Sequence, residues 1–538
     1  LAASVINMYA KCGFLTKAQE VIEELHDPNI ESWNALISGY ANENHGSQAV
    51  DYFKRMKCEG IFPDVVTFTC ILKACGKTRD LSKGKEIHNE IVSRDLLRGD
   101  VVLGTAMVDM YAKCGMLSRA QMVFDRLLVR NVVTWNALIA GYGLHERFHE
   151  ALTCYERMRK EGFSPDIVTF ICLLKACGCV KGGIKKGEQI HDEIVSTGLL
   201  EKDVVLGSAL VDMYAKCGMI RRAQQVLEEI PIRNIFSWSS LIQGYVQMDQ
   251  GQEALNCFDR MRSEGLSPDA ITFICVLKAC SKTGRIEIGE NIHAEIVRRG
   301  LLENDVVLGN ALLDMYAKCG ALAKTKRTFE EFSVRDLVSW NSLITGYASQ
   351  GRVDEALFYI GMMQIEGLFP DAVTYISILK ECGSTQRIDM GEQIHDDIVD
   401  TGLLEKNIIL GNALVDMYTK CGMLLKAQQV LEDLPFRDVI TWNALISGYA
   451  QQGQGHEALT CFKQMQSEGL SPDATTLVCI LKSCGSLGAM VEGIQIHEES
   501  ARSGWLYKDI PLGNTLIDMY AKCGLISKAQ EVLEEFPF

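Results

Sequence analysis

Two motifs in this sequence have residue types and spacings that metal chemistry uses. His145-Glu146-Arg147-Phe148-His149 has the His-Glu-x-x-His spacing of zinc proteases, which needs both histidines on one face of a continuous helix. His191-Asp192-Glu193 has the His-x-Glu spacing of zinc deaminases, whose site also needs Pro-Cys-x-x-Cys. Twenty cysteines are present, but no two have the Cys-x-x-Cys spacing. The apolar pattern around 145–149 indicates a turn between helices. We therefore predict no metal site, no cofactor and no catalytic residue.

The histidines and cysteines instead recur at a nearly constant interval along the chain. The recurring cysteines, separated by 102 or 103 residues, are Cys12, Cys114, Cys217, Cys319, Cys421 and Cys523. The recurring histidines are His88, His191, His293, His395 and His497. Self-similarity at a fixed period indicates an array of structural repeats. We interpret the histidines as packing residues between repeats and the cysteines as small buried apolar side chains.

Each interval divides into three related segments of 35, 36 and 31 residues, and each segment has the pattern of two helices. The 36-residue segment has 37 residues in one cycle, at 167–203. In the segment that begins at Val132, residues Trp135, Leu138, Ile139 and Tyr142 fall at i, i+3, i+4 and i+7, which is one apolar helical face. We expect Thr134 to cap this helix at its start.

Such a short helix pair cannot bury its own apolar face, so neighbouring pairs must stack. The pattern predicts an all-α fold, an α-solenoid of stacked helix pairs in a single array over 1–538. The predicted repeats are 1–29, 30–64, 65–100, 101–131, 132–166, 167–203, 204–234, 235–269, 270–305, 306–336, 337–371, 372–407, 408–438, 439–473, 474–509 and 510–538. The first and last are incomplete, so we interpret the chain as a fragment of a longer protein.

Composition excludes several other classes of protein. The chain has 538 residues, of which 47% are hydrophobic and 23% charged, as in ordinary globular proteins rather than disordered ones. No apolar run reaches the roughly 18 residues that a membrane span needs. The formal net charge of −15 argues against non-specific binding of nucleic acid, although it says nothing about a local groove.

The cycle of repeat lengths and the motifs within it resemble the PLS type of the plant pentatricopeptide repeat family. The 35-residue repeats read Val-Val-Thr-Trp-Asn-Ala-Leu-Ile-Ala-Gly-Tyr from Val132, and the 36-residue repeats read Thr-Phe-Ile-Cys-Leu-Leu-Lys-Ala-Cys from Thr169. The 31-residue repeats read Leu-Gly-Asn-Ala-Leu-Leu-Asp-Met-Tyr-Ala-Lys-Cys-Gly from Leu308. The resemblance covers the whole chain, and it implies that the α-solenoid is a right-handed superhelix. Tetratricopeptide repeats keep one length of 34 residues and do not cycle through three.

The resemblance implies sequence-specific binding of single-stranded RNA, one base per repeat. In this family the fifth and the last residue of a repeat face the base. The fifth residues of the 35- and 31-residue repeats are Asn34, Thr105, Asn136, Ser208, Ser239, Asn310, Asn341, Asn412, Asn443 and Asn514. The last residues are Asp64, Asn131, Asp166, Asn234, Asp269, Asp336, Asp371, Asp438 and Asp473. An amide both donates and accepts, a hydroxyl does either, and an ionised carboxylate only accepts. The alternative is a structural role, since Asp and Asn also favour turns.

The family's code gives a hypothetical target. By resemblance, Asn with Asp favours uracil, Ser or Thr with Asn favours adenine, and Ser with Asp favours guanine. The chain then reads U-n-A-U-n-A-G-n-U-U-n-U-U-n-Y from 5′ to 3′, where n marks a 36-residue repeat. Those repeats carry Thr69, Ile171, Ile274, Ile376 and Val478 at the fifth position, and only Thr69 can hydrogen-bond a base. We interpret the others as spacers or as contacts for partner proteins.

Two further sets of residues are candidates for contact with RNA. The apolar second residues Val133, Val205 and Val307 would pack against base faces, whereas Glu31 departs from that pattern. Lysines recur before the Cys-Gly turn of the 31-residue repeats, at Lys113, Lys216, Lys318, Lys420 and Lys522. They are candidate phosphate contacts. A favourable interaction with the helix C-terminus is the alternative.

The leading hypothesis is an RNA-recognition solenoid that positions an organellar transcript for processing, most often C-to-U editing in proteins of this type. We expect a monomer that binds single-stranded RNA and organellar RNA-processing proteins, with no membrane contact, in the mitochondrion or chloroplast. A deaminase domain often follows such arrays, so this chain alone should not edit. The second hypothesis is a protein–protein scaffold. An enzyme is the third, and turnover of peptide or cytidine substrates with zinc would support it.

Overall fold

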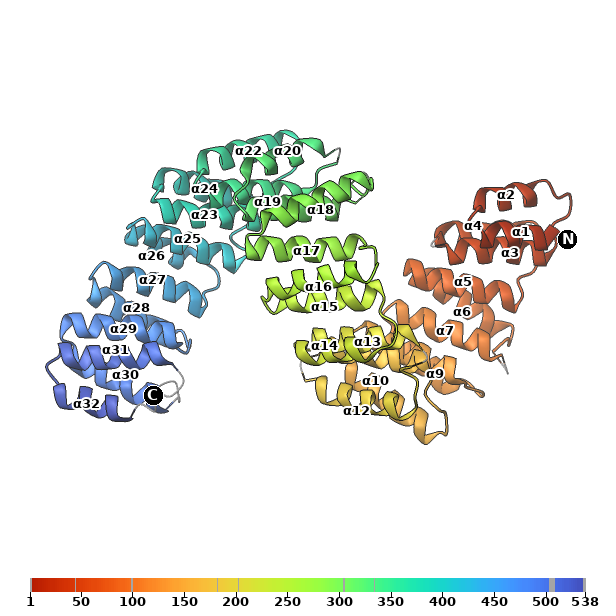
Figure 1. The fold of residues 1–538 in the computed structure, drawn as a ribbon, viewed down its shortest axis with the longest axis horizontal. Coiled ribbons are helices and arrows are strands. Elements are labelled where there is room, and N and C mark those ends of the chain that lie inside the picture. The colour runs from red at the N-terminus through yellow and green to blue at the C-terminus, as the bar shows by residue number, and fades with distance from the viewer. Residues whose placement is uncertain are drawn as a thin grey trace. The chain divides into compact units, whose positions relative to one another are not determined.

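The computed structural model describes residues 2–43, 45–97, 100–180, 182–201, 203–302, 305–332, 334–502 and 509–535. Within these ranges it contains 32 α-helices and no strand, so the predicted all-α fold of helix pairs is confirmed (Figure 1). The chain forms two compact units, 1–279 and 280–538, and helix α17 runs across the boundary between them. No helix in the described ranges is both long and apolar enough to span a bilayer.

The helices of the first unit come in pairs of an odd-numbered and an even-numbered helix. They are α1 (Ala2–Lys11), α2 (Leu15–Glu23), α3 (Ile30–Asn42), α4 (Gly46–Cys58), α5 (Val65–Thr78), α6 (Leu81–Ser93), α7 (Val101–Lys113), α8 (Leu117–Arg126), α9 (Val132–Leu144), α10 (Phe148–Lys160), α11 (Ile167–Gly178), α12 (Ile184–Ser196), α13 (Val204–Lys216), α14 (Ile220–Glu229), α15 (Ile235–Gln247), α16 (Gly251–Ser263) and α17 (Ala270–Thr283).

The second unit continues the same pairing. Its helices are α18 (Ile286–Arg298), α19 (Val306–Lys318), α20 (Leu322–Glu331), α21 (Leu337–Ser349), α22 (Val353–Ile365), α23 (Ala372–Thr385), α24 (Ile388–Thr401), α25 (Ile408–Lys420), α26 (Leu424–Asp433), α27 (Val439–Gln451), α28 (Gly455–Ser467), α29 (Ala474–Leu487), α30 (Met490–Arg502), α31 (Ile510–Lys522) and α32 (Ile526–Glu535).

Odd-numbered helices form the closely packed row of each unit. Helix α7, for example, packs against α5 and α9 as well as against its own partner α8. Among the described residues, even-numbered helices pack only against the odd-numbered helices before and after them. The core therefore runs along the odd-helix row, and each pair completes the core of its neighbours.

The predicted apolar face of α9 is buried as expected. Trp135, Leu138 and Ile139 have no exposed surface, and Tyr142 is 8% exposed. The predicted packing role of the recurring histidines is also confirmed, with a polar contact that the sequence pattern does not reveal. His191 is buried and its Nδ1 lies 3.0 Å from the hydroxyl of Tyr214, in the next repeat. The other four histidines make the same contact, at 2.6–2.9 Å, with Tyr111, Tyr316, Tyr418 and Tyr520.

The predicted cap of α9 is wrong. Asn131, the last residue of the preceding repeat, is the N-cap, and its Oδ1 accepts a hydrogen bond from the Thr134 N–H at 2.9 Å. Thr134 lies three residues into the helix, where its hydroxyl accepts from the Asn131 N–H in a capping box. The reason is backbone conformation, since only Asn131 has the extended φ of −131° and ψ of 177° that an N-cap adopts.

The recurring cysteines are less buried than predicted. Cys12 is exposed, and Cys114, Cys217, Cys319, Cys421 and Cys523 are partly exposed. They lie at the C-caps of odd-numbered helices, before a glycine such as Gly115 with φ of 77°, so the chain is leaving the core at that point. The Sγ of Cys114 points at the carbonyl of Cys75 in the preceding repeat, 3.8 Å away.

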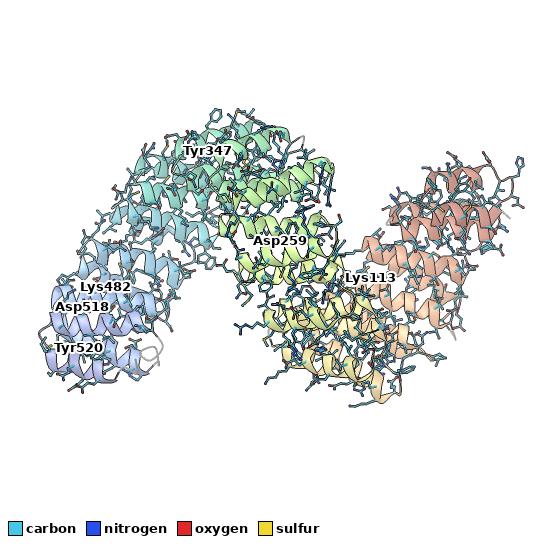
Figure 2. All side chains as sticks on the ribbon, viewed as in Figure 1. Lys113, Asp259, Tyr347, Lys482, Asp518 and Tyr520 are labelled. Atoms are coloured by element: carbon cyan, nitrogen blue, oxygen red, sulfur yellow. The ribbon has the colours of Figure 1, made fainter. Side chains whose placement is uncertain are left out.

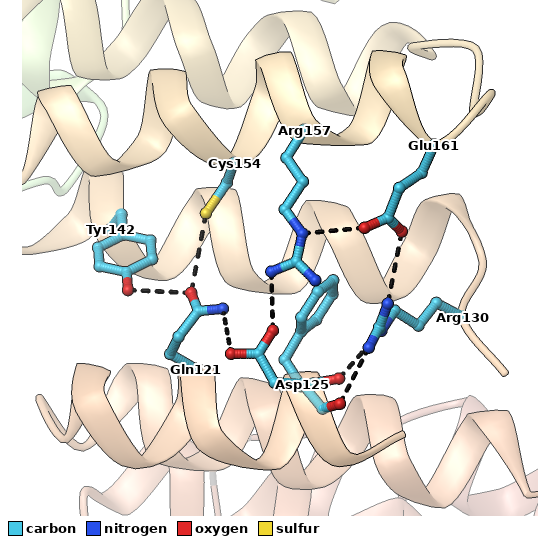
Figure 3. A network of polar contacts seen from close by, with 8 residues as sticks. Gln121, Asp125, Arg130, Tyr142, Cys154, Arg157 and Glu161 are labelled. Atoms are coloured by element: carbon cyan, nitrogen blue, oxygen red, sulfur yellow. Dashed lines mark hydrogen bonds and ion pairs between the residues drawn. The ribbon is translucent and has the colours of Figure 1, made fainter. Parts of the chain in front are cut away.

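An arginine links each of the four complete 31-residue repeats to the 35-residue repeat that follows, as Figure 3 shows for Arg130. Arg130 donates from Nε to the Phe124 carbonyl at 3.0 Å and pairs with Glu161 at 3.4 Å. Arg157 joins Glu161 at 2.9 Å to Asp125 at 2.7 Å. Arg233, Arg335 and Arg437 make the corresponding contacts in the later cycles. The guanidinium groups satisfy carbonyls at the helix end that would otherwise lack a partner.

Small residues allow the odd-numbered helices to approach closely at the same joint. A Cβ added at Gly141 of α9 would lie 2.4 Å from the Cβ of Ala112 on α7. We expect Gly141→Ala to destabilise the fold by about 1–3 kcal/mol, because neither helix can yield without moving its backbone. Gly361 in α22 is the matched control, since an added Cβ there meets nothing within 4 Å. Gly361→Ala should stabilise the fold by about 0.5–1 kcal/mol.

Urea unfolding followed by circular dichroism measures both effects. Unfolding of a long repeat array need not be two-state, so midpoints of the local transitions are the quantity to compare. Equal shifts in the same direction for the two variants would contradict the close approach of α7 and α9.

Candidate nucleic-acid interface

The fifth and last residues of the 35- and 31-residue repeats meet at the start of the odd-numbered helices. In six repeats the fifth-residue amide donates from Nδ2 to an Oδ1 of the last residue at 2.9–3.2 Å. These pairs are Asn34–Asp64, Asn136–Asp166, Asn310–Asp336, Asn341–Asp371, Asn412–Asp438 and Asn443–Asp473. Residues that are 26 or 30 positions apart in sequence are thereby brought into one polar site per repeat.

A third side chain fixes the orientation of each amide. The hydroxyl of Thr169 donates to the Asn136 Oδ1 at 2.6 Å, while its backbone N–H donates to Asp166 at 2.8 Å. The hydroxyls of Thr67, Ser339, Thr374, Thr441 and Thr476 contact their amides in the same way. The Thr or Ser at the third position of the helix, which the sequence suggested as the cap, therefore belongs to both the polar site and the capping box.

The repeats with a hydroxyl at the fifth position are arranged differently. Thr105 Oγ1 lies 2.8 Å from Thr134 Oγ1, and Ser239 Oγ lies 2.6 Å from Thr272 Oγ1, so each contacts the third residue of the next repeat. Ser208 donates to the Val204 carbonyl and lies 3.0 Å from Asn234 Oδ1. Its side chain is fully buried, so only Asn234 of that pair presents polar surface. Asn131 and Asp269 are exposed.

Three aspartates of these sites, Asp64, Asp166 and Asp336, have lowered pKa values. Burial alone would raise the pKa of Asp166, but hydrogen bonds from the Thr169 backbone, from Asn136 and from the Thr169 hydroxyl outweigh it and lower that pKa. The pKa values of Asp64 and Asp336 are lowered by the same balance. Each carboxylate is then a pure acceptor at neutral pH.

In the second unit, two successive polar sites open onto one groove. A groove of about 400 Å³ is lined by Asn412, Asn443, Asp473 and Ile440, among others. Asn412 is 8% exposed, so a ligand in this groove meets one edge of its amide rather than the whole group. Asn341 and Asn443 are partly exposed, and Asn514 is exposed.

The second residues form an exposed apolar row beside these sites. Val133, Val205 and Val307 are 59%, 56% and 64% exposed. The row also includes the 36-residue repeats, with exposed apolar residues at Val66, Val168, Ile271 and Val373. Glu31 is exposed as well, which is an ordinary position for a charged side chain.

The candidate phosphate lysines have partners that the sequence analysis missed. Lys113 pairs with Asp109 at 2.7 Å, and Lys216, Lys318, Lys420 and Lys522 pair with Asp212, Asp314, Asp416 and Asp518 at 2.7–2.8 Å. The signal was available, because an Asp four residues before a Lys on a helix predicts this pair.

The remaining candidates do not join the polar sites. Thr69 donates its hydroxyl to the Val65 carbonyl of its own helix at 2.8 Å, and Ile171, Ile274, Ile376 and Val478 are partly buried. His145 caps the end of α9 and lies 2.9 Å from the Ala112 carbonyl, whereas His149 lies in α10. The two histidines are therefore not on one continuous helix. Within the described ranges, no cluster of three or more His, Cys, Asp or Glu residues could hold a metal ion.

Comparison with known sequences finds the same repeats along the chain. A model of the PPR repeat family matches residues 28–77, 130–179, 233–282, 335–384 and 437–486. A PPR repeat model matches 3–30, 66–96, 105–132, 208–235, 271–301, 412–439 and 514–537.

Similar full-length proteins come from Arabidopsis thaliana. A chloroplastic pentatricopeptide repeat-containing protein is 31% identical over 99% of this chain, which spans 65% of that protein. A mitochondrial one is 31% identical over the whole chain, which spans 61% of it, and a third is 32% identical with 77% of its length covered. The chain thus spans less than two thirds of the first two relatives.

Solved structures of low sequence identity share the fold. The pentatricopeptide repeat protein PPR10 from maize is 21% identical, with a TM-score of 0.60 over 99% of this chain and 83% of that one. A structure of PPR10 in complex with an 18-nt psaJ RNA element has a TM-score of 0.61 at 19% identity, over 98% of this chain and 84% of that one.

Two substitutions of Asp166, the last residue of its repeat, separate its role as a helix cap from the effect of its carboxyl group. Asp166→Ala should cost about 1 kcal/mol, because α11 loses its N-cap and Asn136 loses its acceptor. Asp166→Asn should change stability by only a few tenths, since Asn caps as well as Asp and already does so at Asn131.

Removing the Asp166 carboxyl group should also change how the stability of the fold depends on pH. Because the pKa of Asp166 is lowered in the folded state, its contribution is present above the unfolded value of about 3.9 and is lost as pH falls below it. Stability measured between pH 3 and pH 7 should therefore fall less in Asp166→Asn than in the wild type. Identical pH profiles would show that Asp166 carries no depressed pKa.

Proposed function

Because the chain belongs to the pentatricopeptide repeat family, we propose that it binds single-stranded RNA and reads one base with each 35- or 31-residue repeat. Support comes from the polar sites, which recur once per such repeat and have different residues in different repeats. The complex of PPR10 with an RNA element is consistent with this proposal. The proposed readers are the fifth and last residues of each repeat, with Val133, Val205 and Val307 packing against bases.

The arrangement around Asn136 is the observation that carries the proposal. Its amide uses one N–H on Asp166 and one lone pair on Thr169, so one N–H and one lone pair remain. The carboxylate of Asp166 has acceptor capacity beyond these bonds. A donor and acceptors on one edge complement uracil, which presents one N–H and carbonyl oxygens there. Orientation by two internal bonds reduces the entropy lost when a base binds.

The finer role follows from the PLS-type cycle of repeat lengths. We propose that the chain positions an organellar transcript for processing, with C-to-U editing as the leading case, and that it acts as a monomer alongside RNA-processing proteins. One of these relatives is named chloroplastic and another mitochondrial, which supports an organellar site. We assign catalysis to another domain or protein, because a deaminase domain often follows arrays of the PLS type.

A protein–protein scaffold is the second candidate function. The partly buried apolar residues at the fifth position of the 36-residue repeats favour it locally. Helix capping accounts for Asp or Asn at the last position, but neither capping nor a scaffold explains why the other two repeat types keep hydrogen-bonding residues at the fifth position. RNA binding explains both the hydrogen-bonding fifth residues of the 35- and 31-residue repeats and the apolar ones of the 36-residue repeats, which read no base.

Fluorescence anisotropy with U-n-A-U-n-A-G-n-U-U-n-U-U-n-Y tests the proposal. We expect Asn341→Thr to move the preference at one base from uracil towards guanine, because a hydroxyl paired with Asp favours guanine in this family. A wrong base should cost about 1–3 kcal/mol, or roughly 5- to 150-fold in affinity. Thr105 shows that this fold accepts threonine at a fifth residue.

The base-scrambled RNA and the same sequence as duplex DNA are the control ligands, each at two salt concentrations. The variant should lose affinity for the original target and regain it when only the matching base is changed. Equal binding of all ligands, or a loss that no single base change restores, would contradict base reading and favour the scaffold.

A further inference from the structure

The 36-residue repeats carry a lysine where the other two repeat types carry none. Counted from the start of each odd-numbered helix, the ninth residue of every 36-residue repeat is lysine: Lys73, Lys175, Lys278, Lys380 and Lys482. In the complete 31-residue repeats the ninth residue is aspartate, and in the 35-residue repeats it is uncharged. The pattern holds in all five cycles, so it belongs to the repeat type rather than to one site.

These lysines lie on the same side of the helix as the proposed base readers. At about 100° per residue, the second, fifth and ninth residues of a helix fall within an arc of roughly 60°. The ninth residue is one to two turns beyond the base-reading position. All five lysines are exposed, and Lys482 on α29 is labelled in Figure 2.

Four of the five ninth-residue lysines differ in their partners from the lysines of the 31-residue repeats. Lys113 of a 31-residue repeat pairs with Asp109, which gives that helix no net charge at these positions. In the part of the chain that the structure describes, Lys73, Lys175, Lys380 and Lys482 make no ion pair. A lysine without an acidic partner can take up a phosphate without first giving up an existing contact.

A groove in the first unit connects Lys175 to the neighbouring repeats. It has a volume of about 610 Å³ and is lined by Lys175 together with the pairs Asp109–Lys113 and Asp212–Lys216 of the 31-residue repeats on either side. Glu146 and Phe236, the latter a second residue, also line it. The groove therefore joins the lysine to the apolar row along which the bases are proposed to pack.

We propose that the ninth-residue lysines of the 36-residue repeats bind the RNA backbone, one phosphate per cycle of three repeats. This inference rests on the proposed function. It gives the repeats that cannot read a base a role of their own: they hold the strand while their neighbours read it. It also explains how a chain with a net charge of −15 would bind a polyanion, because each of these lysines lies on the same side of its own helix as the proposed readers.

Replacing three of these lysines tests the proposal against a matched control of equal charge. The test variant is Lys73→Gln/Lys175→Gln/Lys482→Gln. The control is Lys160→Gln/Lys185→Gln/Lys463→Gln, whose lysines are exposed on the even-numbered helices α10, α12 and α28. Both lower the net charge by three. Equal thermal melting curves by circular dichroism show that both fold, as expected for exposed side chains.

The readout is the affinity for the predicted RNA and for its base-scrambled version over a range of salt concentrations. Each phosphate contact to a single strand contributes about 0.7 to the slope of log K against log salt, so the test variant should lose about 2 units of slope. At 0.1 M salt its affinity should fall on the order of 100-fold, and the difference should vanish near 1 M. Its preference for the predicted over the scrambled RNA should not change.

The outcomes distinguish this inference from the function on which it rests. If the wild type prefers the predicted RNA but the test and control variants have equal slopes, the lysines do not bind phosphate while base reading stands. If the slope falls as expected but the wild type does not discriminate, the backbone contacts stand and base reading is wrong. A wild type that binds neither RNA overturns both.

Discussion

The Asp or Asn that ends each 35- or 31-residue repeat is the residue on which the rest of the structure depends. Its side chain accepts the free N–H at the start of the next odd-numbered helix, as Asp166 does from Thr169. In the six Asn–Asp repeats, the same carboxylate accepts from the amide one repeat earlier, as it does from Asn136. A helix start and a polar recognition site are therefore built from the same bonds. Ordering one orders the other, so the solenoid presents its readers at no further conformational cost.

The helix pairs and their buried faces could be predicted from the sequence, because the spacing of apolar residues indicates which face of a helix is buried. The face of Trp135, Leu138 and Ile139 repeats at helical spacing, and it is buried. The identity of the cap could not be derived in that way. Asn131 and Thr134 are both good capping residues, and only the backbone conformation decides between them.

Two other features depend on the place of a residue along its helix rather than on its type. The recurring cysteines resemble core residues in composition, but Cys114 lies at a C-cap where the chain leaves the core. The Asp–Lys pairs such as Asp109–Lys113 are predicted by the spacing of the two residues at i and i+4 on a helix. That spacing is overlooked when the recurring lysine is considered alone. The full burial of Ser208 has no signal in the sequence, because Thr105 and Ser239 carry similar hydroxyl groups at the same position and are less buried.

The capping role also limits how recognition can change between repeats. An exchange of Asp for Asn keeps the cap, as Asn131 and Asn234 show, and it replaces a pure acceptor with a group that also donates. A residue that cannot cap would lose about 1 kcal/mol at every helix start where it occurred, and over many repeats that loss would exceed the stability of the array. Helix formation therefore limits the last residue of a repeat to residues that cap well. Recognition of a base can then select only among those residues. Variation at the fifth position is freer, because Asn, Ser and Thr all reach the hydroxyl or amide beside them without taking part in the cap.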